Sequence, residues 1–144
     1  MVAADELVGA WHLVSWEVVT DGRAVHPFGD DADGVLTYTA DGTMQATVAA
    51  AGRQPYSAPT ARRSPDGEVA AAARAYFSYA GTWHLDGAVV VHDVTLALDP
   101  GFVGTRQRRH ADLDGDRLTL SADEPVGDTR RHHRLTWRRA ADRP

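Results

Sequence analysis

The residues of this sequence best suited to chemistry are His92 and Arg109, each of which stands in a segment of alternating apolar residues. An imidazole with its ordinary pKa of about 6.5 accepts or donates a proton near neutral pH, so His92 is the first candidate for acid–base catalysis. An arginine enclosed by apolar side chains requires a negative partner, which either Glu17 or an acidic ligand would supply. Glu17 is therefore a second candidate catalytic residue.

The pair Asp86-Gly87 predicts a hairpin that directs His92 inward. A two-residue turn at these positions places Gly81 opposite His92. The face of the second strand that holds His92 is the more apolar of its two faces, and the more apolar face turns to the core. We therefore expect His92 inside, beside a glycine that leaves it room.

A second turn, at Asp114-Gly115, gives the same direction to Arg109. It places Arg109 opposite Leu120, and Gln107 shares the face of Arg109. Both side chains would then reach the interior, where an amide and a guanidinium can hydrogen-bond a ligand.

A third turn concerns Tyr38. Residues 40–42 predict a three-residue loop with its glycine in the left-handed conformation, which pairs Tyr38 with Met44. A two-residue loop would pair Tyr38 with Gln45 and break the apolar pattern. Tyr38 is accordingly a candidate to hydrogen-bond a ligand.

The facing of the first predicted strand, residues 8–19, is ambiguous because both of its alternations are largely apolar. One alternation contains Trp11, Leu13, Ser15 and Glu17, and the other contains Val14, Trp16 and Val18. We favour the first, which directs Ser15 and Glu17 to the interior.

Four further residues are candidates to contact a ligand. The hydroxyl of Thr105 could bond to it, and Trp83 could form a cavity wall. Tyr76 and Tyr79, on or after the predicted helix, could line a lid. Each of the four also fits ordinary core packing.

Eight segments rich in Val, Thr, Trp and Tyr predict strands. They span residues 8–19, 34–39, 43–49, 80–85, 88–98, 102–113, 117–122 and 132–139. Between the third and fourth, Ser64 and Pro65 predict the cap and first turn of one helix that runs to about Tyr79. We expect an all-β fold, an eight-stranded antiparallel up-and-down barrel that can hold one small ligand. An open sheet or a sandwich without a cavity is the alternative.

Composition limits the chemistry open to this chain. Its 144 residues fit a single domain, 1–144, and contain neither Cys nor Lys, which excludes thiolate and Schiff-base catalysis. A net charge of -5 argues against nucleic-acid binding. The seven histidines lack the spacing of a metal motif, and there is no P-loop or dinucleotide fingerprint, so we expect neither metal nor cofactor. With no long apolar run and no basic, apolar leader, we expect a cytoplasmic protein without membrane contact.

The run Leu7-Val8-Gly9-Ala10-Trp11-His12-Leu13-Val14-Ser15-Trp16-Glu17 resembles the start of the bacterial and fungal lipocalin-like domain family. Further similar segments follow in order: 27–29, 34–39, 41–44, 79–83, 91–92, 118–120 and 135–139. The resemblance implies a closed barrel in which Trp11 packs under Arg138 or Arg139.

The same resemblance implies two functions from different classes. Our leading hypothesis is a cofactor-independent cyclase or isomerase of natural-product biosynthesis, acting on an apolar intermediate inside the barrel. The alternative is a non-catalytic binding or carrier protein for a hydrophobic or weakly acidic small molecule. A homodimer is left open.

Overall fold

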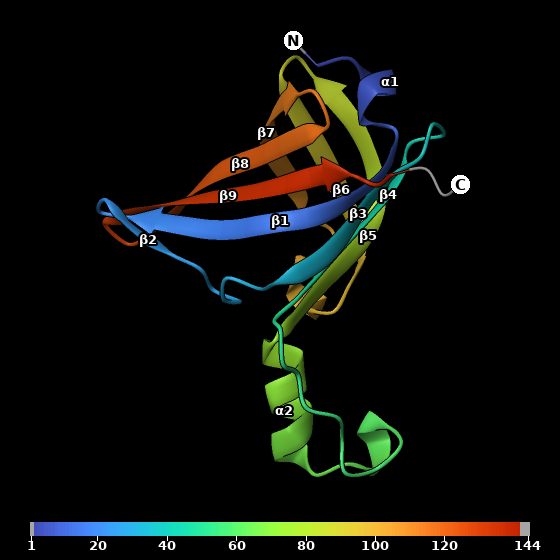
Figure 1. Ribbon diagram of the computed structural model, residues 1–144, viewed down its shortest axis with the longest axis vertical. Coiled ribbons are helices and arrows are strands. Elements are labelled where there is room, and N and C mark those ends of the chain that lie inside the picture. The colour runs from blue at the N-terminus through green and yellow to red at the C-terminus, as the bar shows by residue number, and fades with distance from the viewer. Residues whose placement is uncertain (1, 142–144) are drawn as a thin grey trace.

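The computed structural model describes residues 2–141, in which nine antiparallel strands form one sheet (Figure 1). The strands are β1 (Gly9–Thr20), β2 (Arg23–Val25), β3 (Asp33–Tyr38), β4 (Thr43–Ala49), β5 (Tyr76–Asp86), β6 (Val89–Ala97), β7 (Arg106–Asp114), β8 (Arg117–Val126) and β9 (Thr129–Arg139). The helical segments are α1 (Ala4–Leu7), α2 (Asp66–Arg74) and the short 3-10 turns η1 (Ala61–Arg63) and η2 (Pro100–Phe102).

The sheet closes because β1 pairs with β3 over residues 9–12 and with β9 over residues 11–20. All strands except β2 take part in this closed ring, and β2 extends the far end of β1. The predicted all-β, eight-stranded antiparallel barrel is confirmed, and so is the position of one helix between its third and fourth strands.

One end of the barrel is sealed by Trp11. This indole is fully buried, and its Nε1 donates to the carbonyl of Leu7 at 3.0 Å. The guanidinium of Arg139 lies 4.2 Å from the Trp11 ring centroid and donates to the carbonyls of Val8 and Glu6. The pairing implied by the family resemblance is therefore present, with Arg139 as the arginine.

A β-bulge divides β1 into two halves that face oppositely. The register with β9 shifts between Leu13 and Ser15, so the residues before and after the shift alternate out of phase. Leu13 is buried in the first half, whereas Val18 is buried in the second. The prediction that Ser15 and Glu17 face the interior is thus wrong, because one inserted residue reverses every side chain after it.

The three hairpins differ in how well their turns were predicted. The loop at 40–42 is confirmed, since Tyr38 pairs with Met44 and Gly42 has a φ of 91°. The other two turns lie one residue later, at 87–88 and 115–116, so that His92 lies opposite Trp83.

This shift corrects two predicted pairs, because Gly81 lies opposite Val94 and Leu120 lies opposite Ala111. In each turn the glycine takes a positive φ at the first loop position, and the preceding aspartate stays in its strand. A shift of two residues in the partner preserves which face each side chain occupies, so the predicted inward direction of His92 survives.

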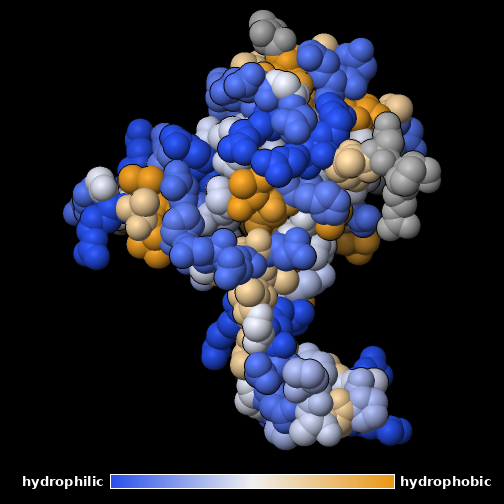
Figure 2. All heavy atoms as spheres, viewed as in Figure 1, coloured by the Kyte–Doolittle hydropathy of each residue, from blue (hydrophilic) through white to orange (hydrophobic). Residues whose placement is uncertain are grey.

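The segment between β4 and β5 projects away from the barrel, with α2 along its length (Figure 1). In the space-filling view it forms a separate lobe joined by a narrow neck (Figure 2). The helix is shorter than predicted: it ends at Arg74, because Tyr76 and Phe77 pair with β4 as strand residues. The hydroxyl of Ser64 donates to the carbonyl of Thr60 and does not cap the helix.

No helix in residues 2–141 has the length and apolar character needed to cross a bilayer.

Candidate functional site

The barrel encloses a cavity of about 390 Å³. Its wall is formed by Trp16, Leu36, Ala46, Val48, Phe77, Tyr79, His92, Phe102, Gln107, Arg109, Leu120, Ala122, Asp123, Glu124, Pro125, His133, Leu135 and Trp137. Most of these side chains are apolar or aromatic, and the few polar ones come from β5–β9. A volume of this size and lining is typical of a site for a small organic molecule.

His92 lies in this wall, held between two tyrosines. The hydroxyl of Tyr38, on β3, is 2.6 Å from Nε2, and the hydroxyl of Tyr79, on β5, is 2.6 Å from Nδ1. The imidazole is 1% exposed, and Tyr38 is equally buried. Both ring nitrogens therefore have a hydrogen-bond partner from the protein itself.

All three members of this chain are uncharged at neutral pH. Burial, helped by the nearby guanidinium of Arg109, lowers the pKa of His92 to about 3. Burial raises the pKa of Tyr79 to about 12 and that of Tyr38 well above its usual value. An imidazole with so low a pKa is a poor proton acceptor, so this geometry provides hydrogen bonds in place of a charged acid or base.

Arg109 reaches the cavity from β7, next to Gln107. Its Nη2 donates to Gln107 Oε1 at 3.2 Å, and the Gln107 amide donates to Thr105 Oγ1 at 2.9 Å. Among the ion pairs formed within residues 2–141, none includes Arg109. An arginine in a cavity wall without a carboxylate partner can bind an acidic or electron-rich oxygen of a ligand.

A second group of polar residues in the cavity wall lies around His133, on β9. Its Nδ1 accepts from Trp16 Nε1 at 3.4 Å, and its Nε2 is 3.3 Å from a carboxylate oxygen of Glu124. The guanidinium of Arg131 is 3.5 Å from the same oxygen. Glu124, on β8, therefore supplies a carboxylate acceptor to this part of the wall, one strand away from Arg109 on β7.

The ring of Trp137 lines the cavity, but its polar atom does not face it. The indole Nε1 is buried and has no hydrogen-bond partner in the part of the chain that the structure describes. The other three indoles donate to Leu7, His133 and Thr39. A buried donor without a partner is costly, so this indole lowers the stability of the fold.

Comparison with known proteins gives the same picture of the fold. The sequence profile described as "Lipocalin-like domain" matches residues 8–140. The chain belongs to the lipocalin-like domain family.

Two individual proteins are similar to this lipocalin-like chain. The 4'-hydroxy-3'-methoxypropiophenone carrier protein ppsC of Aspergillus oryzae is 31% identical over 84 residues, which cover 51% of this chain and 76% of that protein. A crystal structure of an uncharacterized protein from Bacteroides eggerthii is 12% identical, with a TM-score of 0.46 over 93% of this chain and 99% of the other.

Three of the predicted site residues line the cavity of this lipocalin-like barrel: His92, Gln107 and Arg109. Two others lie directly behind them, since Tyr38 contacts His92 and Thr105 contacts Gln107. The structure thus brings these five predicted residues together.

Four other predicted residues lie elsewhere. Trp83 packs on Tyr38 and donates to the carbonyl of Thr39. Tyr76, the first residue of β5, stacks under Arg53 from the projecting segment. Ser15 follows the bulge in β1, so its side chain lies on the outer face of that strand.

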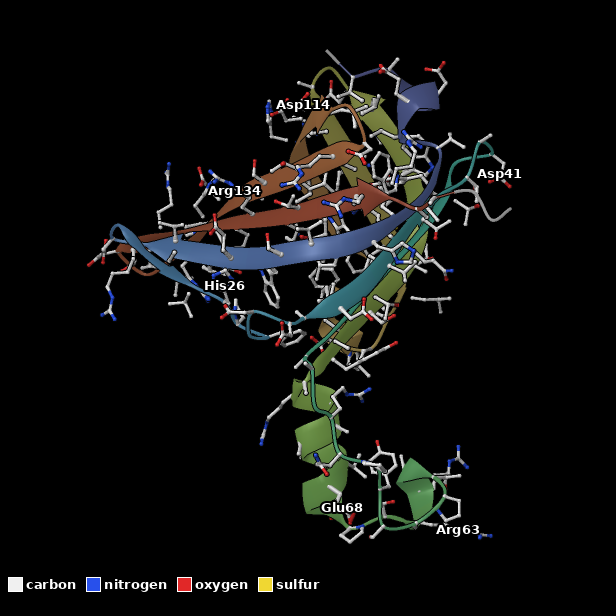
Figure 3. All side chains as sticks on the ribbon, in the orientation of Figure 1. His26, Asp41, Arg63, Glu68, Asp114 and Arg134 are labelled. Carbon is white, nitrogen blue, oxygen red and sulfur yellow. The ribbon has the colours of Figure 1, made fainter. Side chains whose placement is uncertain are left out.

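The predicted pair between Glu17 and Arg109 is absent. Glu17 instead bonds Arg134 at 3.3 Å on the outer side of β9, where Figure 3 labels this arginine. The lid expected from Tyr76 is not formed either, because α2 and its residue Glu68 lie on the projection, away from the barrel (Figure 3).

Tyr79, which the sequence assigned to a lid with Tyr76, lies instead in the cavity wall and bonds to His92. It lies on the same face of β5 as Gly81 and Trp83, so extending that alternation backwards would have found it together with Phe77. The predicted helix covered both positions and concealed the signal.

Within the described range, no group of three or more His, Asp or Glu side chains is arranged to hold a metal ion.

Proposed function

We propose that this barrel is a carrier that binds a small, mostly apolar molecule bearing an acceptor oxygen and releases it unchanged. The observation that carries the proposal is the uncharged imidazole of His92, fixed by Tyr38 and Tyr79 in the wall of an apolar cavity. Such a wall can orient a ligand, but it offers no group near His92 that exchanges protons at neutral pH.

The guanidinium of Arg109 in the cavity wall supports a ligand with an acceptor oxygen. Among residues 2–141, Arg109 has no carboxylate partner. A guanidinium only donates, so a carbonyl, phenolate or enolate oxygen would satisfy it and a second donor would not.

The relative from Aspergillus oryzae supports an aromatic ketone as the class of ligand, because its name gives it as the carrier of a hydroxy-methoxy-propiophenone. Aromatic cavity residues suit such a ring: Phe77, Phe102 and Tyr79 contact one another edge to face or at a tilt. The carbonyl would lie toward the donors, and a phenolic hydroxyl would lie toward Glu124 and His133.

A cyclase or isomerase is the second candidate, and Arg109 is the observation that favours it. A guanidinium beside a neutral tyrosine hydroxyl would stabilise negative charge that develops on an enolate oxygen. Catalysis would then depend on shape and on Arg109, with no proton transfer by His92. Glu17 would have no direct part, because it bonds Arg134 outside the barrel.

Titration of the purified protein with propiophenone and with its 4'-hydroxy-3'-methoxy derivative tests the proposal. Trp16 and Trp137 line the cavity, so binding should change tryptophan fluorescence in a saturable way. Mass spectrometry of the recovered ketone should show it unchanged, whereas a rearranged product would establish the enzyme in place of the carrier.

A matched pair of variants locates the binding site. Ala122 lines the cavity, while its neighbour Ser121, opposite Arg134, faces outward on β8. Ala122→Phe should abolish the fluorescence response and Ser121→Phe should preserve it. An equal response from both variants would place the ligand outside the barrel.

A further inference from the structure

The direction of the hydrogen bonds around His92 follows from the number of protons that each group carries. A neutral imidazole has one N–H donor and one bare nitrogen acceptor. Its two partners, Tyr38 and Tyr79, each have one proton and can each accept one. Only two arrangements of these protons are possible.

In the first arrangement, Tyr38 donates to Nε2 and the Nδ1–H of His92 donates to Tyr79. The proton of Tyr79 is then free, and Tyr79 lines the cavity, where a ligand or water can accept it. The two buried donors, the Tyr38 hydroxyl and the Nδ1–H of His92, each have an acceptor.

In the second arrangement, Tyr79 donates to Nδ1 and the Nε2–H donates to Tyr38. The proton of Tyr38 would then need an acceptor, but Tyr38 is 1% exposed, does not line the cavity and has His92 as its one side-chain hydrogen-bond partner among residues 2–141. A buried donor would be left unpaired, which is strongly unfavourable. The first arrangement therefore prevails.

We propose that Tyr38, buried behind the cavity, fixes the tautomer of His92 and thereby makes Tyr79 a hydrogen-bond donor to the ligand. Tyr38 is a positioning residue that acts through two hydrogen bonds without touching the ligand. Tyr79 is the residue that determines specificity, since an O–H aimed into an apolar cavity selects a ligand with a carbonyl or similar oxygen at that point. The part that concerns the ligand rests on the proposed function.

Nuclear magnetic resonance of the ligand-free protein tests the tautomer directly. In protein labelled with ¹⁵N at histidine, two-bond correlations should show that the fully buried ring of His92 carries its proton on Nδ1, with Nε2 unprotonated. Protonation on Nε2 would overturn the proposal. This measurement needs no ligand, so it stands or falls independently of the proposed function.

The effect on specificity is tested with propiophenone and propylbenzene, which share a skeleton and differ in the carbonyl oxygen. The ratio of their affinities measures the contribution of that oxygen alone. Tyr79→Phe should lower the ratio about tenfold, the usual size of one lost hydrogen bond. Tyr56→Phe, which removes a hydroxyl from the projection, should leave the ratio unchanged.

The decisive variant is Tyr38→Phe, which removes no atom from the cavity wall. Without the Tyr38 hydroxyl, each arrangement leaves one group of the imidazole unpaired: the bare Nε2 in the first and the Nε2–H in the second. The first arrangement thus loses its advantage of having every group paired, and Tyr79 can turn its proton to Nδ1. We expect a several-fold fall in the ketone-to-hydrocarbon ratio, together with loss of the pure Nδ1–H signature in the ¹⁵N spectrum. A folded Tyr38→Phe protein that keeps both the tautomer and the ratio would refute the positioning role.

Discussion

The hydroxyl of Tyr79 lies 2.6 Å from Nδ1 of His92, a contact between adjacent strands that leaves the imidazole no free nitrogen, since Tyr38 occupies the other. This contact determines which role a histidine in a cavity wall can have. A histidine with one free nitrogen is a candidate base, whereas one bonded through both nitrogens is a support for its neighbours. The polar groups left to contact a ligand are then Tyr79 and Arg109.

Acid should destabilise the fold through His92. Its pKa is about 3 in the folded protein and about 6.5 in the unfolded chain, so the unfolded state takes up the proton first as the pH falls. The stability associated with the neutral ring is complete above pH ~6.5 and is lost progressively down to pH ~3. Urea unfolding at pH 7 and pH 4 should show wild type losing about 3 kcal/mol more than His92→Gln. Equal losses would mean that His92 titrates normally in the folded state.

Arg109 should govern affinity for acidic ligands. Arg109→Met removes the cavity-facing cation, so the affinity for a carboxylate probe such as 3-phenylpropionate should fall by about tenfold or more. Its neighbour Arg108 points outward to Asp86, at 2.9 Å, and provides the control. Calorimetric titration should show Arg108→Met binding the probe as wild type does. Similar losses in both variants would point to a general effect of net charge.

The sealed end of the barrel should depend on Arg139. Arg139→Met removes a cation over the Trp11 ring and two hydrogen bonds to the chain around α1, at a cost of roughly 2–4 kcal/mol. Arg138 is exposed on the opposite face of β9, so Arg138→Met should stay within about 0.5 kcal/mol of wild type. Thermal unfolding of both variants measures the difference, and equal melting temperatures would contradict the structural role.

Gly81 should tolerate no side chain. An added Cβ would lie 1.9 Å from the carbonyl oxygen of Asp93, which is backbone and cannot move aside without breaking the β5–β6 ladder. Gly81→Ala should therefore destabilise the fold by about 3 kcal/mol or more. Gly101→Ala, where an added Cβ would meet nothing within 4 Å, is the control. A Gly81→Ala protein as stable as the control would show that β5 and β6 are farther apart than described.

The sequence predicted the parts of the fold that follow from alternation and turn chemistry. The loop at 40–42 fixed the pairing of Tyr38 with Met44, and the facing of His92 and Arg109 was correct although both of their turns lie one residue later. Each turn error shifted the paired residue by two positions, which leaves every side chain on the same face of its strand. The predicted cavity-facing residues were therefore correct even though their predicted cross-strand partners were not.

Two features could not be obtained from periodicity. The bulge after Leu13 is invisible because both alternations of β1 are apolar, so nothing in the pattern marks the inserted residue. The stretch from Tyr76 to Tyr79 has apolar residues at helical spacing, yet pairing with β4 makes it a strand. The hydrogen bond between Tyr79 and His92 depended on that second feature and was missed with it.

The most direct test of the account is to locate propiophenone on the protein by intermolecular nuclear Overhauser effects. If the barrel binds the ketone, its protons should contact the methyl groups of Leu36, Ala46, Leu120 and Leu135, which line the cavity from four different strands. The exposed Leu96 and Leu98 offer comparable methyl groups on the outside. Contacts to the cavity methyls alone are the predicted result, and contacts confined to Leu96 and Leu98, or none at saturating ketone, would contradict a ligand-binding barrel.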